Sequence, residues 1–275
     1  MKFTILGASG FVGSHLVEYL AKKEIPYFAP ARGDNSIFTQ ELGEVIYAIG
    51  LTADFREKPY ETVQAHVCYL LEILQKTKYD SFLYLSSTRI YRNAVDTAEN
   101  SPLQCNPLEL DNIYNISKLM GESLCLNTKN ERVRIARLSN VFGKDYKSQN
   151  FLSTIIKGAL IAKKIVFQTA PSSEKDYIYI KDLIELLLKI SLNGKHQVYN
   201  VASGLNISNA TLASCLKELT GCQIETSKEA PQIIFPQIKI ERLKEEFSFQ
   251  PTELTASLKE VVENFRKKIS DENRN

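Results

Sequence analysis

Short apolar runs alternate with amphipathic segments along most of the chain. The apolar runs predict strands at residues 2–6, 27–31, 44–49, 81–85, 132–138 and 197–201. Apolar residues at three- and four-residue spacing predict helices at about 11–23, 59–77, 111–128 and 181–192. Strands and helices in this order are typical of an α/β protein with a Rossmann-like, doubly wound parallel sheet.

Glycines at positions 7, 10 and 13 separate the first predicted strand from the first predicted helix. The first glycine permits a tight turn, the second lets backbone amides approach a pyrophosphate, and the third lets the helix pack against the strand. The alternative is that these glycines only end a strand and ease packing. A strand before them and a helix after them favour a dinucleotide site, because free N–H groups at the helix start then face the phosphates. The expected contacts in this turn are Gly7, Ser9, Gly10, Phe11, Val12 and Gly13.

The segments at 145–175 and after about 203 fit the alternation of strands and helices less well. We therefore predict a dinucleotide-binding domain over residues 1–144, to which 176–202 return, and a smaller C-terminal substrate lobe over 145–175 and 203–275. A helix at about 252–268 is expected to close that lobe. Ligands of open parallel sheets bind at the carboxyl ends of the strands, so the lobe is placed to cover them.

The sequence YNISK, from Tyr114 to Lys118, carries the candidate chemistry. Residues four apart share one face of a helix, so the phenol and the ammonium can meet the same ligand. A neighbouring cation stabilises phenolate, and we expect Lys118 to lower the pKa of Tyr114 toward a range useful for proton transfer. The same spacing occurs twice elsewhere, but only this pair follows an apolar run that ends in serine hydroxyls, at 86 and 87.

Composition narrows the classes of function. The 275 residues are 44% hydrophobic and 24% charged, as in a globular protein, and a net charge of +2 gives no electrostatic basis for binding nucleic acid. No apolar stretch approaches the roughly 20 residues that span a bilayer, and the N-terminus lacks a signal-peptide pattern. We therefore expect a cytoplasmic protein without a membrane partner. Five cysteines without a C-x-x-C pair predict reduced thiols and neither a disulfide framework nor a zinc site.

Five motifs occur in order along the chain: GASGFVG, LSSTRIY, YNISK, RLSNVFG and KDYIYIKDL. In this order they resemble the extended short-chain dehydrogenases/reductases, notably the NAD-dependent nucleotide-sugar epimerases, dehydratases and ketoreductases, over about residues 1–260. The resemblance implies that Tyr114 is the general acid/base and that Lys118 holds the nicotinamide ribose and tunes Tyr114. Ser87, four residues before Tyr91, would hydrogen-bond the reacting oxygen; its alternative role is capping of the strand end. Ser87, Tyr114 and Lys118 are called the catalytic trio below.

The resemblance also implies the other ligand contacts. Expected cofactor contacts beyond the glycine turn are Arg32, Ala48, Ile49, Gly50, Tyr114, Lys118 and Leu138, and expected substrate contacts are Ser87, Thr88, Asn140, Asn150, Phe151 and Lys175. No metal is expected. Lys175 stands where relatives place an arginine that pairs with diphosphate. The lysine keeps the positive charge of that arginine but cannot form its two parallel hydrogen bonds. The same analogy implies a homodimer packed through the helices at 59–77 and 111–128.

Three positions depart from the family pattern. Arg92 stands where the family usually has a glycine, and it either reaches the substrate cleft or points to solvent. His66 replaces an asparagine that supports the lysine in many relatives, and it is either a structural residue or part of a proton relay. The 12 residues between Arg32 and Val45 are too few for the usual additional strand and helix, so we predict a shortened adenine end of the cofactor site.

The end of the second predicted strand bears on the choice between NADP and NAD. A carboxylate there would bind the ribose 2′-hydroxyl and repel a 2′-phosphate, but the chain has Ala31 followed by Arg32. Arginine matches phosphate with a bidentate fork, so we predict NADP, with NAD as the alternative. Asp34 is close enough to bind a ribose or to pair with Arg32 instead.

Two enzyme functions and one binding function remain. A dehydratase of this family usually has Asp and Glu directly after the strand-end Ser or Thr, where this chain has Thr88 and Arg89, so the acid and base for dehydration are missing. Arg32 favours a reductase that consumes NADPH and acts on a nucleotide-linked keto-sugar. An epimerase that retains NAD is the alternative. A non-catalytic NAD(P)-sensing module is disfavoured because the catalytic trio is intact.

Overall fold

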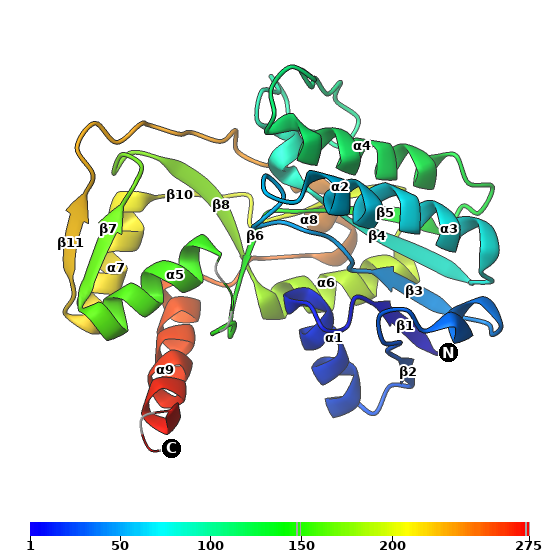
Figure 1. The fold of residues 1–275 in the computed structure, drawn as a ribbon, viewed down its shortest axis with the longest axis horizontal. Coiled ribbons are helices and arrows are strands. Elements are labelled where there is room, and N and C mark those ends of the chain that lie inside the picture. The colour runs from blue at the N-terminus through cyan, green and yellow to red at the C-terminus, as the bar shows by residue number, and fades with distance from the viewer. Residues whose placement is uncertain (147, 149, 273, 275) are drawn as a thin grey trace.

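The computed structural model describes residues 1–146, 148, 150–272 and 274. A six-stranded sheet lies at its centre in the order β2-β1-β3-β4-β5-β9, and every neighbouring pair is parallel (Figure 1). Its strands are β1 (Phe3–Leu6), β2 (Tyr27–Phe28), β3 (Glu44–Tyr47), β4 (Ser81–Ser87), β5 (Val133–Leu138) and β9 (Val198–Val201). Each predicted strand is therefore present, which confirms the predicted parallel sheet.

Helices cover both faces of this sheet (Figure 1). One face packs against α1 (Phe11–Lys22) and α6 (Ile180–Asn193), and the other packs against α4 (Asn112–Leu126), with α2 (Pro59–Val63) and α3 (Tyr69–Lys76) beside it. Side chains of β4 alternate between two apolar clusters, because successive residues of a strand point to opposite faces. The predicted helix at 59–77 is one continuous run in which a π-helical turn, Gln64–Cys68, joins α2 to α3. This arrangement confirms the doubly wound architecture.

The β2 edge of the sheet is abbreviated. The predicted strand at 27–31 ends at Phe28, because Pro30 has no N–H with which to continue the pairing with β1. Between this point and β3 the chain forms a 3-10 helix, Asn35–Phe38, in place of a further strand and a full helix. The structure thus confirms that this edge lacks room for the usual additional pair of elements.

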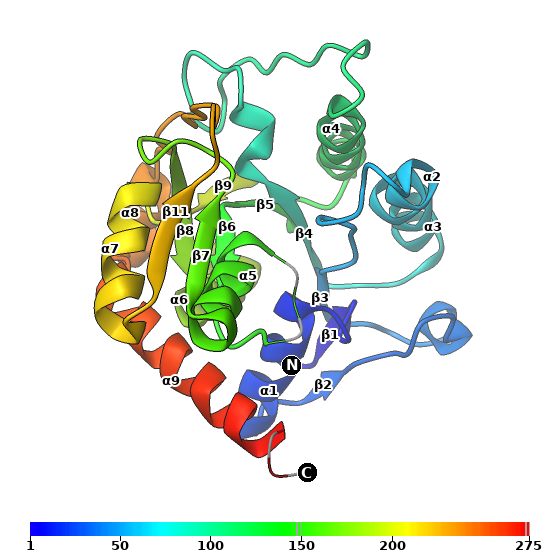
Figure 2. The same ribbon diagram turned by 60° about the vertical axis from the view of Figure 1, so that its left-hand side comes forward.

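The remaining elements lie beyond β5 (Figure 2). β6 (Asn140–Phe142), β8 (Glu174–Tyr179) and β10 (Asn206–Ser208) form a three-stranded sheet, and β7 (Lys164–Phe167) pairs with β11 (Gln223–Thr226). The helices here are α5 (Phe151–Lys157), α7 (Asn209–Thr220), α8 (Glu241–Phe247) and α9 (Leu254–Glu272). Helix α9 confirms the predicted C-terminal helix and packs on α7, α5 and β8, whereas α8 packs on β9 of the central sheet. The division of the chain into two domains stays a prediction.

Helix α4, which contains YNISK, lies unusually close to the central sheet at Gly121. A Cβ atom at this position would overlap the hydroxyl of Tyr84 on β4 and would lie 2.9 Å from the carbonyl oxygen of His66. Any larger residue would therefore push α4 away from both β4 and the π-helical turn. Glycine is a poor helix former, so its use inside α4 serves this close approach.

The next residue of α4 fixes the helix to two strands. The buried carboxylate of Glu122 accepts a hydrogen bond of 2.5 Å from Ser86 on β4 and one of 2.7 Å from the buried guanidinium of Arg137 on β5. Burial alone lowers the pKa of Arg137, but the bonds and charge of Glu122 outweigh it and raise that pKa overall. The buried Arg137–Glu122 pair holds α4 in register with the ends of β4 and β5.

Three further features concern the class of protein. Within the described residues, no helix is both long enough and apolar enough to cross a membrane. All five cysteines are free in this structure, and two of them are buried. No group of three or more His, Cys, Asp or Glu side chains in the described part of the chain is arranged to hold a metal ion.

Gly121→Ala is expected to lower the free energy of unfolding by about 1–3 kcal/mol, the usual cost of overpacking a filled core. Helix propensity alone predicts the opposite change in the free energy of unfolding, because alanine is the better helix former by about 1 kcal/mol. Urea unfolding measures the change. Ser123→Ala, at an exposed position of the same helix, is the matched control and should change stability by no more than about 0.5 kcal/mol. An unchanged or increased stability of Gly121→Ala would contradict the close docking of α4.

Candidate active site

A cavity of about 540 Å³ lies at the carboxyl ends of the central strands. Its walls come from the turn after β1, from the residues that follow β3, β4 and β5, and from α4. The opposite side is formed by β8, the start of α5 and residues 235–238. Ligands of doubly wound sheets bind at this end of the strands, so the cavity is the candidate active site.

Most of the predicted ligand contacts line this cavity together. The lining includes the predicted cofactor contacts Gly10, Phe11, Val12, Ala48, Ile49, Gly50, Tyr114, Lys118 and Leu138. It also includes the predicted substrate contacts Ser87, Thr88, Asn140, Asn150, Phe151 and Lys175. Four predicted contacts lie outside the lining, namely Gly7, Ser9, Gly13 and Arg32.

The glycine turn has the shape that a phosphate group requires. Gly7 has a positive φ of 93°, and a Cβ at Gly13 would overlap the carbonyl oxygen of Gly7, so these two residues form the turn without lining the cavity. Helix α1 begins after Gly10, and no side chain of the described residues caps its start. Its first N–H groups are therefore free to bind an anion, which fits the diphosphate of a dinucleotide.

Arg32 lies in an exposed turn just beyond β2. The nearby carboxylate of Asp34 accepts a hydrogen bond of 2.9 Å from the backbone N–H of Ser36 and so caps the 3-10 helix. Among the described residues Arg32 has no ion-pair partner. The alternative in which Asp34 pairs with Arg32 therefore gains no support, and the guanidinium is available to a ligand at this edge of the sheet.

The phenol of Tyr114 is buried beside the end of β4, and Tyr114 and Ser87 line the same cavity. Burial raises the pKa of Tyr114, while the polar side chain of Ser87 and the charge of Arg89 lower it by a smaller amount. The phenol is therefore protonated in the free protein at neutral pH. This corrects the expectation that Lys118 lowers the pKa of Tyr114: the cation that acts on the phenol is Arg89.

Lys118 is tied to the central sheet. Its buried Nζ donates a hydrogen bond of 2.8 Å to the carbonyl oxygen of Leu85 on β4 and lies 5.0 Å from the centre of the Tyr84 ring. Burial lowers the pKa of Lys118 to about 7. The ammonium thus has unused donors in the cavity and gains stability from any acceptor or anion that a ligand brings.

His66 lies on the π-helical turn and is completely buried. Its Nδ1 lies 2.8 Å from the hydroxyl of Ser117, which itself donates to the carbonyl oxygen of Tyr114, so Nδ1 carries the proton and Nε2 is an acceptor. Nε2 has no partner among the described residues and lies beside Gly50 and Lys118. Burial and the charge of Lys118 lower the pKa of His66 to about 2. The imidazole therefore stays neutral, and a relay role based on a near-neutral pKa does not apply.

Several predicted substrate contacts have partners within the protein. Thr88 donates to the carbonyl oxygen of Leu138, Asn140 donates to that of Asp176, and the side chain of Asn150 caps α5. Lys175 has no such anchor among the described residues, and its Nζ lies 5.0 Å from the centre of the Phe151 ring. Burial, and then the charge of Arg89, lower the pKa of Lys175.

The sequence interpretation missed other residues of the cavity wall. Phe55 lines the cavity near Tyr114, with ring centres 5.2 Å apart. It lies in the loop between β3 and α2, at the carboxyl end of the sheet, which is where the parallel-sheet pattern predicts ligand contacts. Phe235 belongs to a segment without a motif, and the adjacent Ile234 reaches β8 through an isolated bridge. Arg92 lies outside the lining with a partly exposed side chain, 3.9 Å from Asp111, which favours the solvent-facing of its two alternatives.

Residues 3–202 match the NAD dependent epimerase/dehydratase family. The chain belongs to this family. Membership confirms the resemblance drawn from the five motifs, and it places the protein among enzymes of the extended short-chain dehydrogenase type that use a nicotinamide dinucleotide, NADP or NAD.

Two relatives illustrate the range of reactions in the NAD dependent epimerase/dehydratase family. GDP-6-deoxy-D-mannose reductase from Pseudomonas aeruginosa is 29% identical over 253 residues, which cover 80% of this chain and 81% of that protein. UDP-glucuronic acid decarboxylase 6 from Arabidopsis thaliana is 22% identical over 98% of this chain and 90% of that protein. Both relatives match the chain over most of their length.

Solved structures of similar proteins share the fold. The structure of RMD from Pseudomonas aeruginosa complexed with NADPH has a TM-score of 0.80 at 24% identity and covers 97% of this chain and 99% of that chain. A UDP-glucose 4-epimerase with UDP-glucose from Thermotoga maritima has a TM-score of 0.81 at 18% identity and covers 98% and 100%. At these identities the likeness establishes the Rossmann-like fold.

Lys118→Met is expected to stabilise the cofactor-free protein, most strongly at low pH. The pKa of Lys118 is about 7 in the folded chain against an ordinary value of 10.5, so between these values the unfolded chain binds more protons. The cost of the buried ammonium is therefore complete below about pH 7 and fades as the pH rises toward 10.5. Thermal unfolding should show a larger gain in melting temperature over wild type at pH 6 than at pH 10.

The control for this experiment is Lys189→Met, at an exposed position of α6. It removes the same charge without relieving a buried ammonium, so its effect should be small and should vary little across the same pH range. A gain for Lys118→Met that is equal at both pH values would contradict a burial-lowered pKa.

Proposed function

We propose that the protein is an NADP(H)-dependent reductase of a nucleotide-linked keto-sugar. A reduced nicotinamide, when bound, supplies the hydride that reaches the carbonyl carbon. Tyr114 gives its proton to the carbonyl oxygen, Ser87 holds that oxygen by a hydrogen bond, and Lys118 holds the nicotinamide ribose. Burial suits Tyr114 to this role, because it keeps the phenol protonated until the oxygen gains charge.

The observation that carries the proposal is that Tyr114, whose pKa is raised by burial, lines the same cavity as Ser87, and that this cavity has no free carboxylate. Among the lining residues, all of which the structure describes, Asp176 is the one acidic side chain. Its oxygens already accept hydrogen bonds from the backbone N–H groups of residues 203–205 and from the hydroxyl of Ser203. Dehydration needs a further acid and base at the sugar, whereas hydride transfer to a carbonyl needs one proton donor.

Two findings support a reductase over an epimerase. Arg32 is exposed and unpaired among the described residues at the edge where the adenosine ribose of a dinucleotide would lie, which favours NADPH. The relative at 29% identity is named a reductase, and the similar RMD structure contains NADPH. An epimerase is the second candidate, since a UDP-glucose 4-epimerase shares the fold. A non-catalytic sensor is the third, and the convergence of the catalytic trio on one cavity speaks against it.

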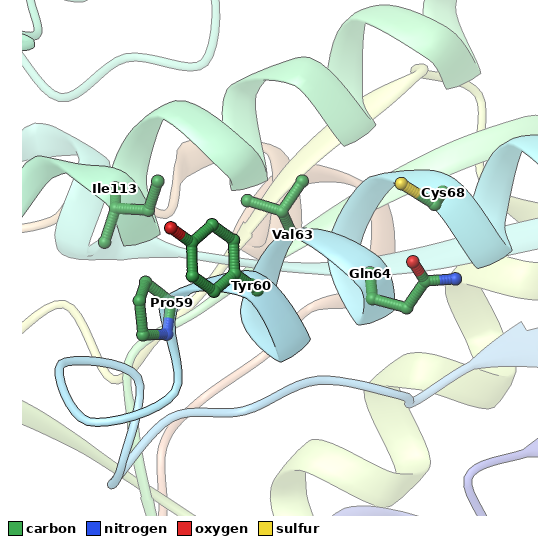
Figure 3. A pocket seen from close by; sticks show the side chains of 6 residues that line it. All are labelled: Pro59, Tyr60, Val63, Gln64, Cys68 and Ile113. Carbon is green, nitrogen blue, oxygen red and sulfur yellow. The ribbon is translucent and has the colours of Figure 1, made fainter.

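We further infer a substrate lobe and a homodimer from the same comparison with the family. The cavity spans both the central sheet and the elements beyond β5, so a lobe over 145–175 and 203–275 would hold the sugar nucleotide against the cofactor domain. On the outer face of α2 and α4, a shallow hollow of about 550 Å³ lies between Pro59, Tyr60, Val63, Gln64, Cys68 and Ile113 (Figure 3). Tyr60 there is 86% exposed, and an apolar hollow on the two predicted contact helices supports a partner subunit at this face.

The decisive experiment follows the hydride. With NADPH deuterated at C4 and a nucleotide-linked 4-keto-sugar, the product should carry one deuterium, and one NADPH should be oxidised for each product formed. Absorbance at 340 nm and mass spectrometry measure both quantities. Tyr114→Phe is the control, because it removes the proton donor and keeps the ring; turnover should fall at least about 10²-fold with little change in NADPH affinity.

The opposite result is equally clear. Sustained interconversion of hydroxyl epimers without added NADPH, and no deuterium transfer to any keto-sugar, would contradict the reductase and support the epimerase. An unaltered kcat in Tyr114→Phe would contradict the role of Tyr114 in either reaction.

Arg32→Ala tests the cofactor preference. Loss of hydrogen bonds between a guanidinium and a 2′-phosphate should weaken NADPH binding by about 10- to 100-fold. NADH lacks that phosphate, so its affinity should hardly change and serves as the internal control. Fluorescence titration measures the affinities of wild type and variant for both cofactors. Equal losses for both cofactors, or a wild-type preference for NADH, would rule out a 2′-phosphate contact at Arg32.

A further inference from the structure

Three arginines surround a single carboxylate beside the active-site cavity. Asp111, just before α4, accepts two hydrogen bonds of 2.6 Å from Arg56, one on each oxygen. Arg89 reaches the same carboxylate only at 3.4 Å, and Arg92 reaches it at 3.9 Å. Arg56 therefore holds Asp111 by a bidentate pair, and Arg89 and Arg92 share the same single carboxylate at longer distances, so three positive charges face one negative charge.

Arg89 is the member of this cluster that faces the cavity. Its guanidinium carbon lies 5.0 Å from the centre of the Phe55 ring and 5.8 Å from the centre of the Tyr114 ring. Its Nε is buried and has no hydrogen-bond partner among the described residues, while 24% of the side chain is exposed. Stacking on aromatic faces holds a guanidinium in place and leaves its edge free for an oxyanion.

The surroundings of Arg89 carry an excess of positive charge. Lys118 and Lys175 line the same cavity, and Asp176, its one acidic lining residue among those described, is occupied by bonds from residues 203–205. After burial, the charge of Arg89 is the second cause that lowers the pKa of Lys175, so the two cations are close enough to repel each other. An anionic group on the ligand would remove this repulsion.

We propose that Arg89 binds a carboxylate on the sugar ring of the substrate, which makes the substrate a nucleotide-linked keto-sugar acid. This inference rests on the proposed function, because Tyr114 then marks the reacting carbon. In a 4-keto-hexose the C6 group stands on C5, next to the reacting C4, whereas the diphosphate is attached at C1 across the ring. The guanidinium carbon of Arg89 lies 5.8 Å from the centre of the Tyr114 ring, so we assign to Arg89 the C6 substituent beside the reacting carbon. Hydride transfer to C4 and proton transfer to O4 leave the carboxylate unchanged.

Binding of matched sugar nucleotides tests this assignment. The probes are UDP-glucuronate against UDP-glucose and GDP-mannuronate against GDP-mannose; the members of each pair differ only at C6. The protein is saturated with NADPH, so that the 4-hydroxyl probes bind without being oxidised, and calorimetry measures each Kd. In at least one pair the acid should bind about 10- to 100-fold more tightly than the neutral sugar, the range for a charge-assisted hydrogen bond.

Variants at two neighbouring arginines make the test specific. Arg89→Gln should abolish the preference for the acid and leave the neutral sugar unchanged, and Arg89→Lys should retain part of the preference. Arg92→Gln is the matched control, because Arg92 faces the same Asp111 but lies outside the cavity lining, and it should keep the full preference. Thermal unfolding verifies that each variant is folded. The preference for the acid can also be measured on the wild-type protein alone.

Failure of the carboxylate assignment can be distinguished from failure of the proposed function. Equal affinity for both members of each binding pair would overturn the carboxylate assignment and leave the reductase intact. Equal weakening of acid and neutral sugar by Arg89→Gln would also overturn it, since Arg89 would then act on the diphosphate or on the fold. If none of the four probes binds, the proposal of a nucleotide-sugar substrate fails, and this inference fails with it.

Discussion

The buried carboxylate of Glu122 joins the elements on which the proposed chemistry depends. It lies one turn after Lys118 on α4 and accepts hydrogen bonds from Ser86 and Arg137, which directly precede the cavity residues Ser87 and Leu138. The helix with the phenol and the strand with the serine hydroxyl are therefore held by the same carboxylate. Removing one member of a buried ion pair typically lowers the free energy of unfolding by about 3–5 kcal/mol, so this attachment is strong.

The second anchor is the π-helical turn at Gln64–Cys68. A π turn displaces backbone carbonyls from their usual partners, and two of these are met by buried hydroxyls of the sheet. Tyr47 donates to the carbonyl oxygen of Ala65 at 2.6 Å, and Tyr84 donates to that of His66 at 3.3 Å. The turn thereby directs His66 toward Lys118 without leaving these backbone groups unsatisfied, which is how a neutral imidazole comes to lie behind the proposed ribose-binding lysine.

Local patterns were sufficient for the central sheet and for much of the site. Strand β4 is a clear apolar run that ends in serines, so parallel-sheet geometry anticipates a strand-end hydroxyl near Tyr114 on α4. The choice of Ser87 over Ser86 comes from the resemblance to the family. Strands β6 and β10 could not be anticipated, because each has three residues and forms only by pairing with β8. The wall that contains Phe235 likewise depends on a contact with β8 that leaves no local signal.

The error at Tyr114 has a different cause. Helical spacing correctly places a lysine on the same face as the tyrosine, but spacing carries no information about burial, and burial is the larger influence on the phenol. Likewise, the three-arginine cluster draws on a loop after β3, the end of β4 and the residue before α4, which are adjacent only in the folded chain. Such clusters are properties of topology, so a reading of motifs one at a time does not contain them.

The shortness of strand β2 bears on the rate at which a bound coenzyme dissociates. With only a 3-10 helix beyond that edge, the adenine ring of a bound dinucleotide would meet little apolar wall, and at this end of the coenzyme the proposed contact of Arg32 would be the main one. Fewer contacts to break at one end shorten the residence time of a ligand, because differences in affinity appear mainly in the dissociation rate. A short-lived complex suits an enzyme that must exchange its coenzyme in every cycle, and would be a handicap for one that keeps the same coenzyme through many cycles.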